Sequence, residues 1–343
     1  MNNTTACPPL GEDTRGEKAV KTLFYSLVIF ISLAGNTLII CLVYKKPKMR
    51  TITNYQIVNM AIADLLITAT AMPATVFQIY EGTRWPFGSL LCKLFVFLQG
   101  ISVSCSVFTM ACIAIDRFAA ILYPYKKYIN QRRSNFMIAV VWFLSVLLQS
   151  PTLYAMRLHH VPGGETYCVE DWTPLFNNLS SQKIYTVVLF VSMYLLPLIV
   201  IAVLYTAISW FLWSHKTPGS RLGKQRKDRS KGKVIKMLVI IVVVFSICWL
   251  PIFVTQFVSF FAMPKCGVSP YLAFIGFFLS HANSAINPCI YAIFNDSYRR
   301  GFIELLVTWF VPSPCLAQPS LLQTGETVEM MENSERAGKG KMV

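Results

Sequence analysis

Seven long apolar runs, separated by polar connectors, dominate the chain. They cover Leu23–Tyr44, Tyr55–Tyr80, Leu91–Leu122, Phe136–Tyr154, Ile184–Trp213, Val234–Phe261 and Tyr271–Phe294. Each run reaches the roughly 20 residues that a helix needs to cross the hydrocarbon core of a bilayer. An alternation of apolar and polar residues with period two does not dominate, which disfavours a membrane β-barrel. The pattern predicts an all-α membrane protein, a seven-transmembrane helix bundle.

The composition indicates a chain whose main solvent is lipid. Hydrophobic residues make up 55% and charged residues only 14% of its 343 residues, whereas a typical soluble domain has about 25% charged residues. We divide the chain into an extracellular N-terminus over 1–22, a transmembrane domain over 23–295, a short amphipathic inner helix over 296–310 and a disordered cytoplasmic tail over 311–343.

The distribution of basic residues predicts the orientation in the membrane. One side of the membrane holds 20 of the 31 Lys and Arg residues. They lie in the connectors after the first, third and fifth runs, at Arg117 and Lys236 in the adjoining run ends, and at the start of the segment after the seventh run. Positive loops stay in the cytoplasm, so we expect a plasma-membrane protein with an extracellular N-terminus. The glycosylation sequons at Asn2, Asn3 and Asn178 fall on the outer side. The net charge of +15 then faces anionic membrane lipids rather than nucleic acid.

Four of the ten cysteines lie on the predicted outer side, where disulfides form. They are Cys7, Cys92, Cys168 and Cys266, and four cysteines allow three pairings. Cys92 begins the third run and Cys168 lies midway along the loop between the fourth and fifth runs, so a bond between them would hold that loop over the mouth of the bundle. We expect this pairing, and with it Cys7 bonded to Cys266.

Polar side chains inside the runs have two interpretations. Asn36, Asp64, Ser106, Asn283 and Asn287 all lie within apolar segments. They could form a hydrogen-bond network that only holds helices together. Alternatively, a buried carboxylate needs a counter-charge or a proton, which would make this cluster a site for a monovalent cation. Residue spacing alone leaves both interpretations open.

Motifs in order along the chain identify a resemblance. Asp116 and Arg117 lie deep in the third run, where unpaired charges are costly. From about Leu23 to Phe302 the chain resembles a rhodopsin-like (class A) G-protein-coupled receptor. The motifs that carry the resemblance are Gly35-Asn36, Met60-x-x-x-Asp64 as a version of the family's Leu-x-x-x-Asp, Cys92, Asp116-Arg117-Phe118, Trp142, Pro197 with Tyr205, Cys248-Trp249-x-Pro251, Asn287-Pro288-x-x-Tyr291 and the following FNDSYRRGF.

The resemblance implies roles for a set of switch residues. It implies that Arg117 pairs with Asp116 at rest and faces the G protein once the inner ends of spans five and six move outward. It implies that Trp249 lies below the ligand pocket, with Phe245, Pro197 and Val107 packed beneath it. Tyr205 and Tyr291 match tyrosines that swing toward the arginine. Asp64, Ser106, Asn283 and Asn287 match the family's allosteric sodium site. A sodium ion is the one cofactor that we expect, and we do not expect the receptor to require it.

Two departures from the family pattern bear on coupling. Phe118 stands where the family usually has tyrosine, and we expect coupling to survive the loss of one hydroxyl. The family's acid at the base of span six is absent from the segment DRSKGKVIKM. A lock between Arg117 and span six is therefore not expected, and basal activity should be appreciable.

Two positions in the predicted pocket narrow the class of ligand. Gln99 stands where amine receptors have an aspartate, and His281 stands where opsins have the retinal lysine. A glutamine at this position resembles instead the pattern in receptors for amidated neuropeptides, namely the neuropeptide Y, neuropeptide FF, orexin and tachykinin group. A glutamine side-chain amide suits such ligands because it can both donate to and accept from a C-terminal amide. The predicted ligand-binding residues are Gln99, Gly100, Val103, Glu170, Phe253, Gln256, Phe277 and His281.

The sequence thus predicts a receptor that binds an extracellular peptide and activates a heterotrimeric G protein. The C-terminal segment GETVEMMENSERAGKGKMV holds few Ser or Thr residues, so we expect arrestin recruitment through phosphorylation to be weak. The alternatives are a receptor of this class for a non-peptide or chemokine-like ligand and, further off, a transporter, although the paired repeats of a transporter are missing. Because no nucleophile motif, metal-spaced histidine cluster or phosphate loop is present, the sequence does not indicate an enzyme.

Overall fold

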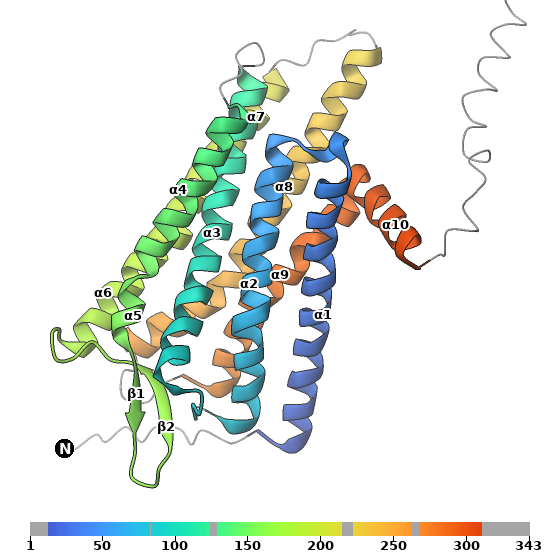
Figure 1. Cartoon of the computed structure of the whole chain (residues 1–343). Coiled ribbons are helices and arrows are strands. Elements are labelled where there is room, and N and C mark those ends of the chain that lie inside the picture. Colours follow the sequence, from blue (N-terminus) through green and yellow to red (C-terminus); the bar gives the residue numbers. More distant parts are fainter. Residues whose placement is uncertain (1–12, 83, 124–128, 215–221, 263–267, 311–343) are drawn as a thin grey trace, which may run out of the picture. The chain divides into compact units, whose positions relative to one another are not determined.

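The computed structural model describes residues 13–82, 84–123, 129–214, 222–262 and 268–310. The chain divides into two compact units, 1–299 and 300–343, which are described separately. In the first unit the long helices run roughly side by side, with a β-hairpin at one end (Figure 1).

Helices account for almost all of the described structure. In chain order the elements are α1 (Arg15–Lys45), the 3-10 turn η1 (Pro47–Met49), α2 (Ile52–Glu81), α3 (Gly88–Leu122), α4 (Gln131–Gln149), α5 (Pro151–Ala155), β1 (Met156–His160), β2 (Thr166–Glu170), α6 (Asn178–Phe190), the π-helical turn η2 (Val191–Leu195), α7 (Leu196–Ser214), α8 (Leu222–Phe257), the π-helical turn η3 (Val258–Ala262), α9 (Pro270–Phe294) and α10 (Asp296–Phe310). The all-α class predicted from the apolar runs is confirmed, since only the short hairpin is extended.

Helices begin before the apolar runs because polar residues cap them. The Thr14 hydroxyl accepts a hydrogen bond from the Glu17 backbone N–H, and the Glu17 carboxylate accepts one from the Thr14 backbone N–H. This capping box satisfies backbone donors that the helix leaves unpaired. It starts α1 at Arg15, ahead of the apolar run. Asn130 and Asn177 cap α4 and α6 by accepting a hydrogen bond from the backbone N–H of Arg133 and Ser180, so these helices too begin before their apolar runs.

Six described helices are long and apolar enough to cross a membrane. They are α1, α2, α3, the combined helix Gln131–Ala155, the combined helix Asn178–Ser214 and the segment Ile235–Ala262 of α8 and η3. The 25-residue helix α9 is long enough to cross as well. It is less apolar because Ser280, His281, Asn283, Ser284 and Asn287 all lie on it, and all five are buried.

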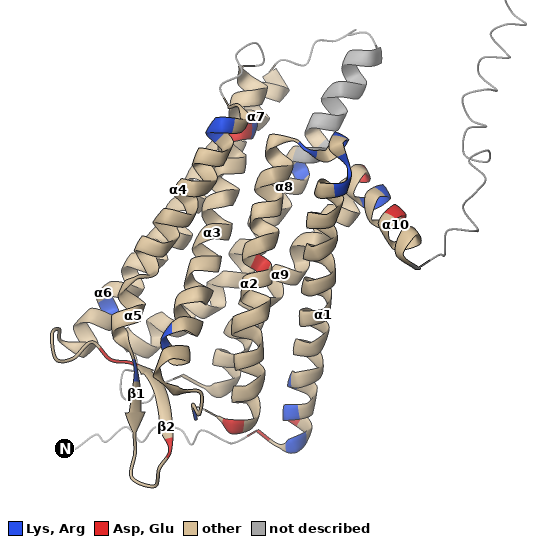
Figure 2. Ribbon diagram, viewed as in Figure 1, with Lys and Arg blue, Asp and Glu red and all other residues tan. Residues whose placement is uncertain are grey.

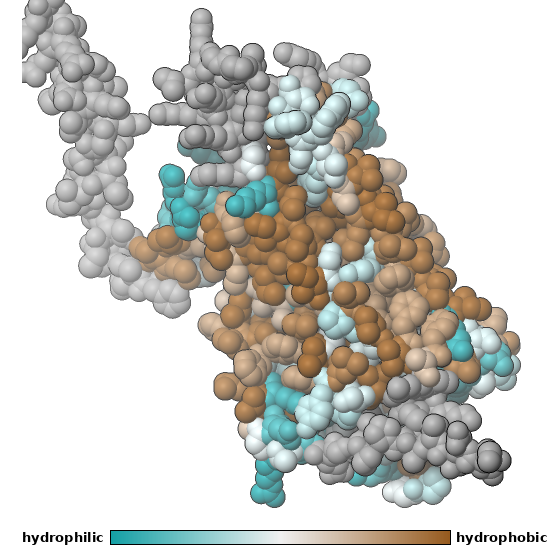
Figure 3. Space-filling view, turned by 180° about the vertical axis from the view of Figure 1, so that it is seen from behind, coloured by the Kyte–Doolittle hydropathy of each residue, from teal (hydrophilic) through white to brown (hydrophobic). Residues whose placement is uncertain are grey.

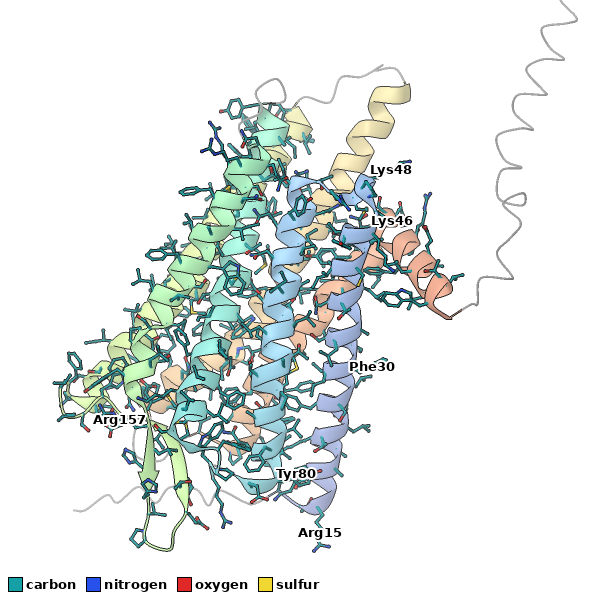
Figure 4. The ribbon with its side chains drawn as sticks, in the orientation of Figure 1. Arg15, Phe30, Lys46, Lys48, Tyr80 and Arg157 are labelled. Atoms are coloured by element: carbon teal, nitrogen blue, oxygen red, sulfur yellow. A yellow bond between two sulfur atoms is a disulfide. The ribbon has the colours of Figure 1, made fainter. Side chains whose placement is uncertain are left out.

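The surface fits a lipid environment. Hydrophobic side chains form a broad band over the face shown in Figure 3. Many large hydrophobic side chains of the described residues are strongly exposed, including Phe30 on α1, Phe136 on α4 and Trp213 on α7. Charged residues gather toward the helix ends (Figure 2). Phe30 points outward from the middle of α1, whereas Lys46 and Lys48 mark one end of the bundle and Arg15 and Arg157 mark the other (Figure 4).

The hairpin and the loop before α3 form one structure at that second end. β1 and β2 are antiparallel, with Leu158 opposite Cys168. The Trp85 backbone N–H donates to the Thr166 carbonyl at 2.7 Å, and the Thr166 hydroxyl donates to the Trp85 carbonyl at 2.5 Å. The Trp85 side chain is buried against Cys92, Phe95 and Met156. These contacts hold the hairpin against the start of α3.

Close helix contacts need small residues or polar pairs. At Gly35 of α1, an added Cβ would lie 2.5 Å from the Cβ of Pro288 on α9, so only glycine allows the two helices to approach this closely. Asn59 of α2 donates to Thr109 of α3 at 2.8 Å and accepts from the Trp142 indole of α4 at 2.8 Å. A single buried amide therefore links three helices.

The helix α10 follows α9 after one residue. The Asn295 side chain accepts hydrogen bonds from the backbone N–H groups of Ser297 and Tyr298 at 3.0 and 3.4 Å, which starts the new helix. It covers Asp296–Phe310, the last of the described residues. The tail predicted to be disordered, 311–343, lies outside the described residues.

Candidate functional site

A cavity of about 510 Å³ lies at the hairpin end of the bundle. Residues of α3, α4, α5, both strands, α6, α8 and α9 line its wall. Ligand pockets for small molecules usually measure about 300–1,000 Å³. The cavity is large enough for a small molecule or for the last few residues of a peptide.

The structure brings the predicted ligand-binding residues together. Seven of the eight line this cavity, namely Gln99, Gly100 and Val103 on α3, Glu170 on β2, Phe253 and Gln256 on α8, and Phe277 on α9. The eighth, His281, is buried on α9 and does not line the wall itself. It meets the cavity through a hydrogen bond with Gln99.

Gln99, His281 and Tyr25 form a polar chain across three helices. Gln99 Nε2 lies 3.2 Å from His281 Nε2, and His281 Nδ1 lies 3.2 Å from the Tyr25 hydroxyl. An amide nitrogen can only donate, so this arrangement needs a neutral imidazole that accepts at Nε2 and donates from Nδ1. The Gln99 carbonyl oxygen accepts no hydrogen bond from the described residues. Gln99 therefore keeps an acceptor, and its second N–H, for a ligand.

Glu170 brings the one charged side chain among the described lining residues. The Trp172 indole N–H donates to Glu170 Oε1 at 2.7 Å, and the Glu170 backbone carbonyl accepts from Gln182 Nε2 at 2.9 Å. Burial raises the pKa of the Glu170 carboxyl above its usual range, and the Trp172 hydrogen bond opposes this only in part. A cationic ligand group nearby would favour the ionised form of this carboxyl, which burial disfavours.

An aromatic cluster forms the floor of the cavity. Trp249 lines the wall, and its ring lies 5.9 Å from the ring of Phe245, which is buried together with Val107 and Pro197. The resemblance did not indicate Tyr194. Its ring contacts those of Phe190, Phe245 and Phe253, and its hydroxyl donates to the Ser246 carbonyl at 2.9 Å. Ligand contact at the floor can therefore reach both η2 and α8.

Sequence reasoning also missed the part of the wall formed by α4, α6 and η2. Gln149, Tyr185 and Met193 line the cavity there. Tyr185 and Met193 belong to an apolar run with no distinguishing signal. Gln149 carried a weak signal, because it is a polar residue near the end of an apolar run.

The predicted polar cluster surrounds Asp64 in the middle of the bundle. The Asn287 amide donates to Asp64 Oδ2 at 3.0 Å. Within the described part of the chain, Asp64 Oδ1, Ser106 Oγ and Asn283 Oδ1 have no hydrogen-bond partner although they are buried. Buried polar atoms without partners are uncommon, and oxygen is the ligand that hard cations prefer. These residues fit a sodium ion.

Asn36 ties this cluster to α1 and α9. Its amide donates to the Ser32 carbonyl and to the Ser284 carbonyl, each at 3.0 Å. The Ser32 hydroxyl lies 2.7 Å from that of Thr68, which in turn donates to the Asp64 carbonyl at 2.7 Å. The network joins α1, α2 and α9, so the two interpretations of the cluster, a helix-binding network and a cation site, are compatible in one structure.

Asp116 and Arg117 meet near the other end of α3. Arg117 Nε donates to Asp116 Oδ2 at 3.0 Å, and Arg117 Nη2 contacts the same oxygen. The Thr53 hydroxyl of α2 donates to it as well, at 3.0 Å. Asp116 is buried, whereas the Arg117 side chain is about a quarter exposed. One carboxylate oxygen therefore holds the arginine and connects it to α2.

Tyr205 and Tyr291 line the same small apolar gap. The gap measures about 10 Å³, roughly the space of one water molecule, and Met60, Met110 and Leu238 line it too. The hydroxyl of Tyr291 is buried and has no hydrogen-bond partner among the described residues. The two tyrosines thus converge on one space from α7 and α9.

The predicted disulfide between Cys92 and Cys168 is present. The predicted bond between Cys7 and Cys266 lies outside the described residues, as do the sequons at Asn2 and Asn3. Asn178 begins α6, and its side-chain oxygen accepts from the Trp172 backbone at 3.1 Å.

Comparison with known proteins defines the class. The model of the 7 transmembrane receptor (rhodopsin family) matches residues 35–291, and the chain belongs to this family. It is therefore a multi-pass membrane receptor, a class A G-protein-coupled receptor and not an enzyme.

Its relatives place it in the neuropeptide receptor group of that class. It is 35% identical over 298 residues to the neuropeptide FF receptor 2 of Rattus norvegicus, which covers 81% of this chain and 70% of that protein. It is 32% identical over 304 residues to the RYamide receptor of Tribolium castaneum, with 85% and 80% covered. It is 31% identical over 299 residues to the Tachykinin-like peptides receptor 99D of Drosophila melanogaster, with 84% and 57% covered.

Proposed function

We propose that this receptor binds an extracellular, C-terminally amidated neuropeptide and activates a heterotrimeric G protein. The observation that carries the proposal is Gln99 in the cavity, held by His281 with its carbonyl oxygen unused by the described residues. A carboxamide offers two donors and an acceptor. Gln99 can therefore pair with a C-terminal amide through one acceptor and one donor, whereas a free carboxylate offers no donor to the Gln99 oxygen.

The relatives and the wall support a peptide. Each relative described above is named for a peptide or neuropeptide. Phe253 and Phe277 supply apolar area for side chains, and Glu170 supplies a negative charge. An acidic residue in such a cavity favours a ligand with a basic side chain.

The end of the bundle opposite the cavity suits a cytoplasmic partner. The connectors rich in Lys and Arg favour this end as the cytoplasmic side. The N-terminus would then lie outside the cell, and we propose that the receptor is in the plasma membrane. Arg117 lies at this end, and we propose that it faces the G protein once Asp116 releases it. Basic residues there would contact anionic lipid, and arrestin recruitment through phosphorylation would be weak.

A paired-ligand screen tests the peptide proposal. Cells that express the receptor are exposed to short amidated peptides, each beside its free-acid twin, while second messengers are recorded. We expect a response to an amidated peptide that its twin lacks. The substitution Gln99→Ala should lower the potency of the amidated form about tenfold or more and should reduce the difference between the twins.

The control is Gln78→Ala, which removes an exposed glutamine of α2 and should leave both potencies unchanged. Silence across the amidated library, together with a response to lipids, amines or chemokine-like proteins, would contradict the peptide proposal. An unchanged preference for the amide in Gln99→Ala would show that another residue reads the C-terminus.

We also propose that the cluster around Asp64 binds sodium. Asp64, Ser106 and Asn283 would supply oxygen ligands, while Asn287 is hydrogen-bonded to Asp64. The ion would supply the positive charge that a buried carboxylate needs. Because the unpartnered oxygens occur together with an intact Asp116–Arg117 pair, a bound cation would stabilise this resting arrangement.

Replacing sodium chloride by choline chloride should therefore raise agonist potency. The expected gain is about tenfold when the sodium concentration is ten times its Kd. Asp64→Asn should abolish the dependence on sodium, while Thr70→Val, elsewhere on α2, should keep it. The measurement is agonist potency in membranes at constant ionic strength. If the agonist potency of the unaltered receptor did not depend on sodium, the cation site would be contradicted, and the cluster would serve only as a hydrogen-bond network between helices.

A further inference from the structure

Three glutamines line the cavity, and one of them, Gln149, has weak hydrogen-bond partners. Gln149 is the last residue of α4 and lies on the wall formed by α4, α5 and α6. Only 2% of its surface is exposed to solvent. A buried amide is costly unless its donors and acceptor are well satisfied, so the quality of its partners matters.

The donors of Gln149 are incompletely used. Its Nε2 lies 3.2 Å from the Ser104 hydroxyl and 3.2 Å from the Met193 sulfur. The hydroxyl is an ordinary acceptor, but a thioether is a weak one. One N–H of the amide is therefore held by a partner that a better acceptor could replace.

The acceptor of Gln149 is in a similar state. The Tyr185 hydroxyl lies 3.5 Å from Gln149 Oε1, at the limit of a hydrogen bond, and 3.2 Å from the Leu148 carbonyl. The phenol has one proton, and the shorter contact to Leu148 is the better acceptor for it. Gln149 Oε1 therefore retains most of its accepting capacity.

The adjacent helix leaves room for this amide. A Cβ added at Gly100 of α3 would lie 2.2 Å from Gln149 Oε1 and 2.5 Å from its Cδ. A glycine within a helix costs about 1 kcal/mol relative to alanine. Here it allows the Gln149 amide to lie against the backbone of α3, on the cavity wall that Gly100 also lines.

The groups that contact the Gln149 amide, namely the Ser104 hydroxyl, the Met193 sulfur and the Tyr185 hydroxyl, are all neutral. Thr152, Tyr185 and Thr186 line the same part of the wall. Among the described lining residues only Glu170 bears a charge, and its carboxylate accepts a hydrogen bond from the Trp172 indole, not from Gln149. The site therefore suits a group that donates and accepts without bearing charge.

We propose that Gln149 determines specificity for a neutral, hydrogen-bonding side chain of the peptide, such as a carboxamide or a hydroxyl. The ligand group would replace the Met193 sulfur as acceptor and donate to Oε1. This inference rests on the proposed function: Gln99 reads the C-terminal amide, and Gln149 reads one side chain further along the peptide.

A positional-scanning library of amidated hexapeptides tests this inference on the full receptor. In each pool one position is fixed and the others are mixed, and second-messenger responses are compared between the unaltered receptor and Gln149→Leu. We expect the unaltered receptor to prefer Gln, Asn, Ser, Thr or Tyr at one position. In Gln149→Leu the response to these polar residues, relative to the response to apolar residues, should fall about tenfold. This change should occur at that position only.

A second variant and a control keep the result interpretable. Gly100→Ala pushes the Gln149 amide from its place and should reproduce the altered profile. Gln78→Leu, at an exposed glutamine of α2 that does not line the cavity, should leave the preference at that position intact. Surface immunostaining confirms that each variant reaches the membrane.

The outcomes separate the two proposals. A profile that Gln149→Leu leaves unchanged, or lowers equally at every position, would overturn the role of Gln149 while the discrimination between amide and free acid stands. A library without effect on the unaltered receptor would contradict the proposed function, and the Gln149 inference with it.

Discussion

Replacing Cys92 by serine is expected to remove most of the receptor from the cell surface. Cys92 is fully buried at the start of α3, and its bond to Cys168 spans 76 residues of sequence. Cross-linking a loop of that length stabilises a fold by about 4 kcal/mol in the chain-entropy description. The bond also holds β2 against α3, and Glu170 of the cavity wall follows Cys168 by two residues. Surface immunostaining against total receptor gives the measurement.

Companion variants separate the bond from the individual cysteines. Cys168→Ser and the double variant should show the same loss as Cys92→Ser, because each removes one shared bond. Cys41→Ser alters a free cysteine of α1 and should keep surface levels. Losses that add in the double variant, or a normal surface level in Cys92→Ser, would contradict this assignment.

Much of the fold could be predicted from apolar runs because a bilayer permits few structures. Backbone groups in lipid must pair within the segment, so an apolar run of about 20 residues must become a helix. Helix ends were less predictable, since Thr14 and Asn130 extend helices through caps that no hydropathy pattern records. The breaks at η2 and η3 were missed as well, because π-helical turns lack a distinctive residue pattern.

The candidate site also contains residues that the sequence could predict and residues that it could not. Gln99 and His281 were predicted from their distances to motifs on the same helix, where position along the sequence gives position in space. Tyr194 and Gln149 escaped because their importance depends on what other helices bring to them. The Gln149 amide lies at the cavity wall only because α3 has a glycine opposite it, and no pattern within a single run contains that information.

The second large effect is expected at the ion pair between Asp116 and Arg117. Asp116→Asn is expected to raise signalling in the absence of ligand. Asparagine keeps the size of the side chain and an oxygen for the Thr53 hydroxyl, but removes the negative charge that faces Arg117. A change of about 1 kcal/mol in the balance between resting and active states alters their ratio about fivefold. Because Arg117 is partly exposed, we expect an effect of that order rather than one typical of a fully buried pair.

Basal nucleotide exchange on the G protein, normalised to surface receptor, measures this change. Thr53→Val is the matched control, because it removes the neutral donor to the same Asp116 oxygen while leaving the charge pair intact, and it should raise basal exchange less. Arg117→Ala should abolish exchange even when combined with Asp116→Asn, since it removes the side chain that Asp116 restrains. If Asp116→Asn signalled no more than the unaltered receptor at equal surface density, Asp116 would not restrain Arg117. Its charge would then serve only to keep α2 and α3 together through Thr53.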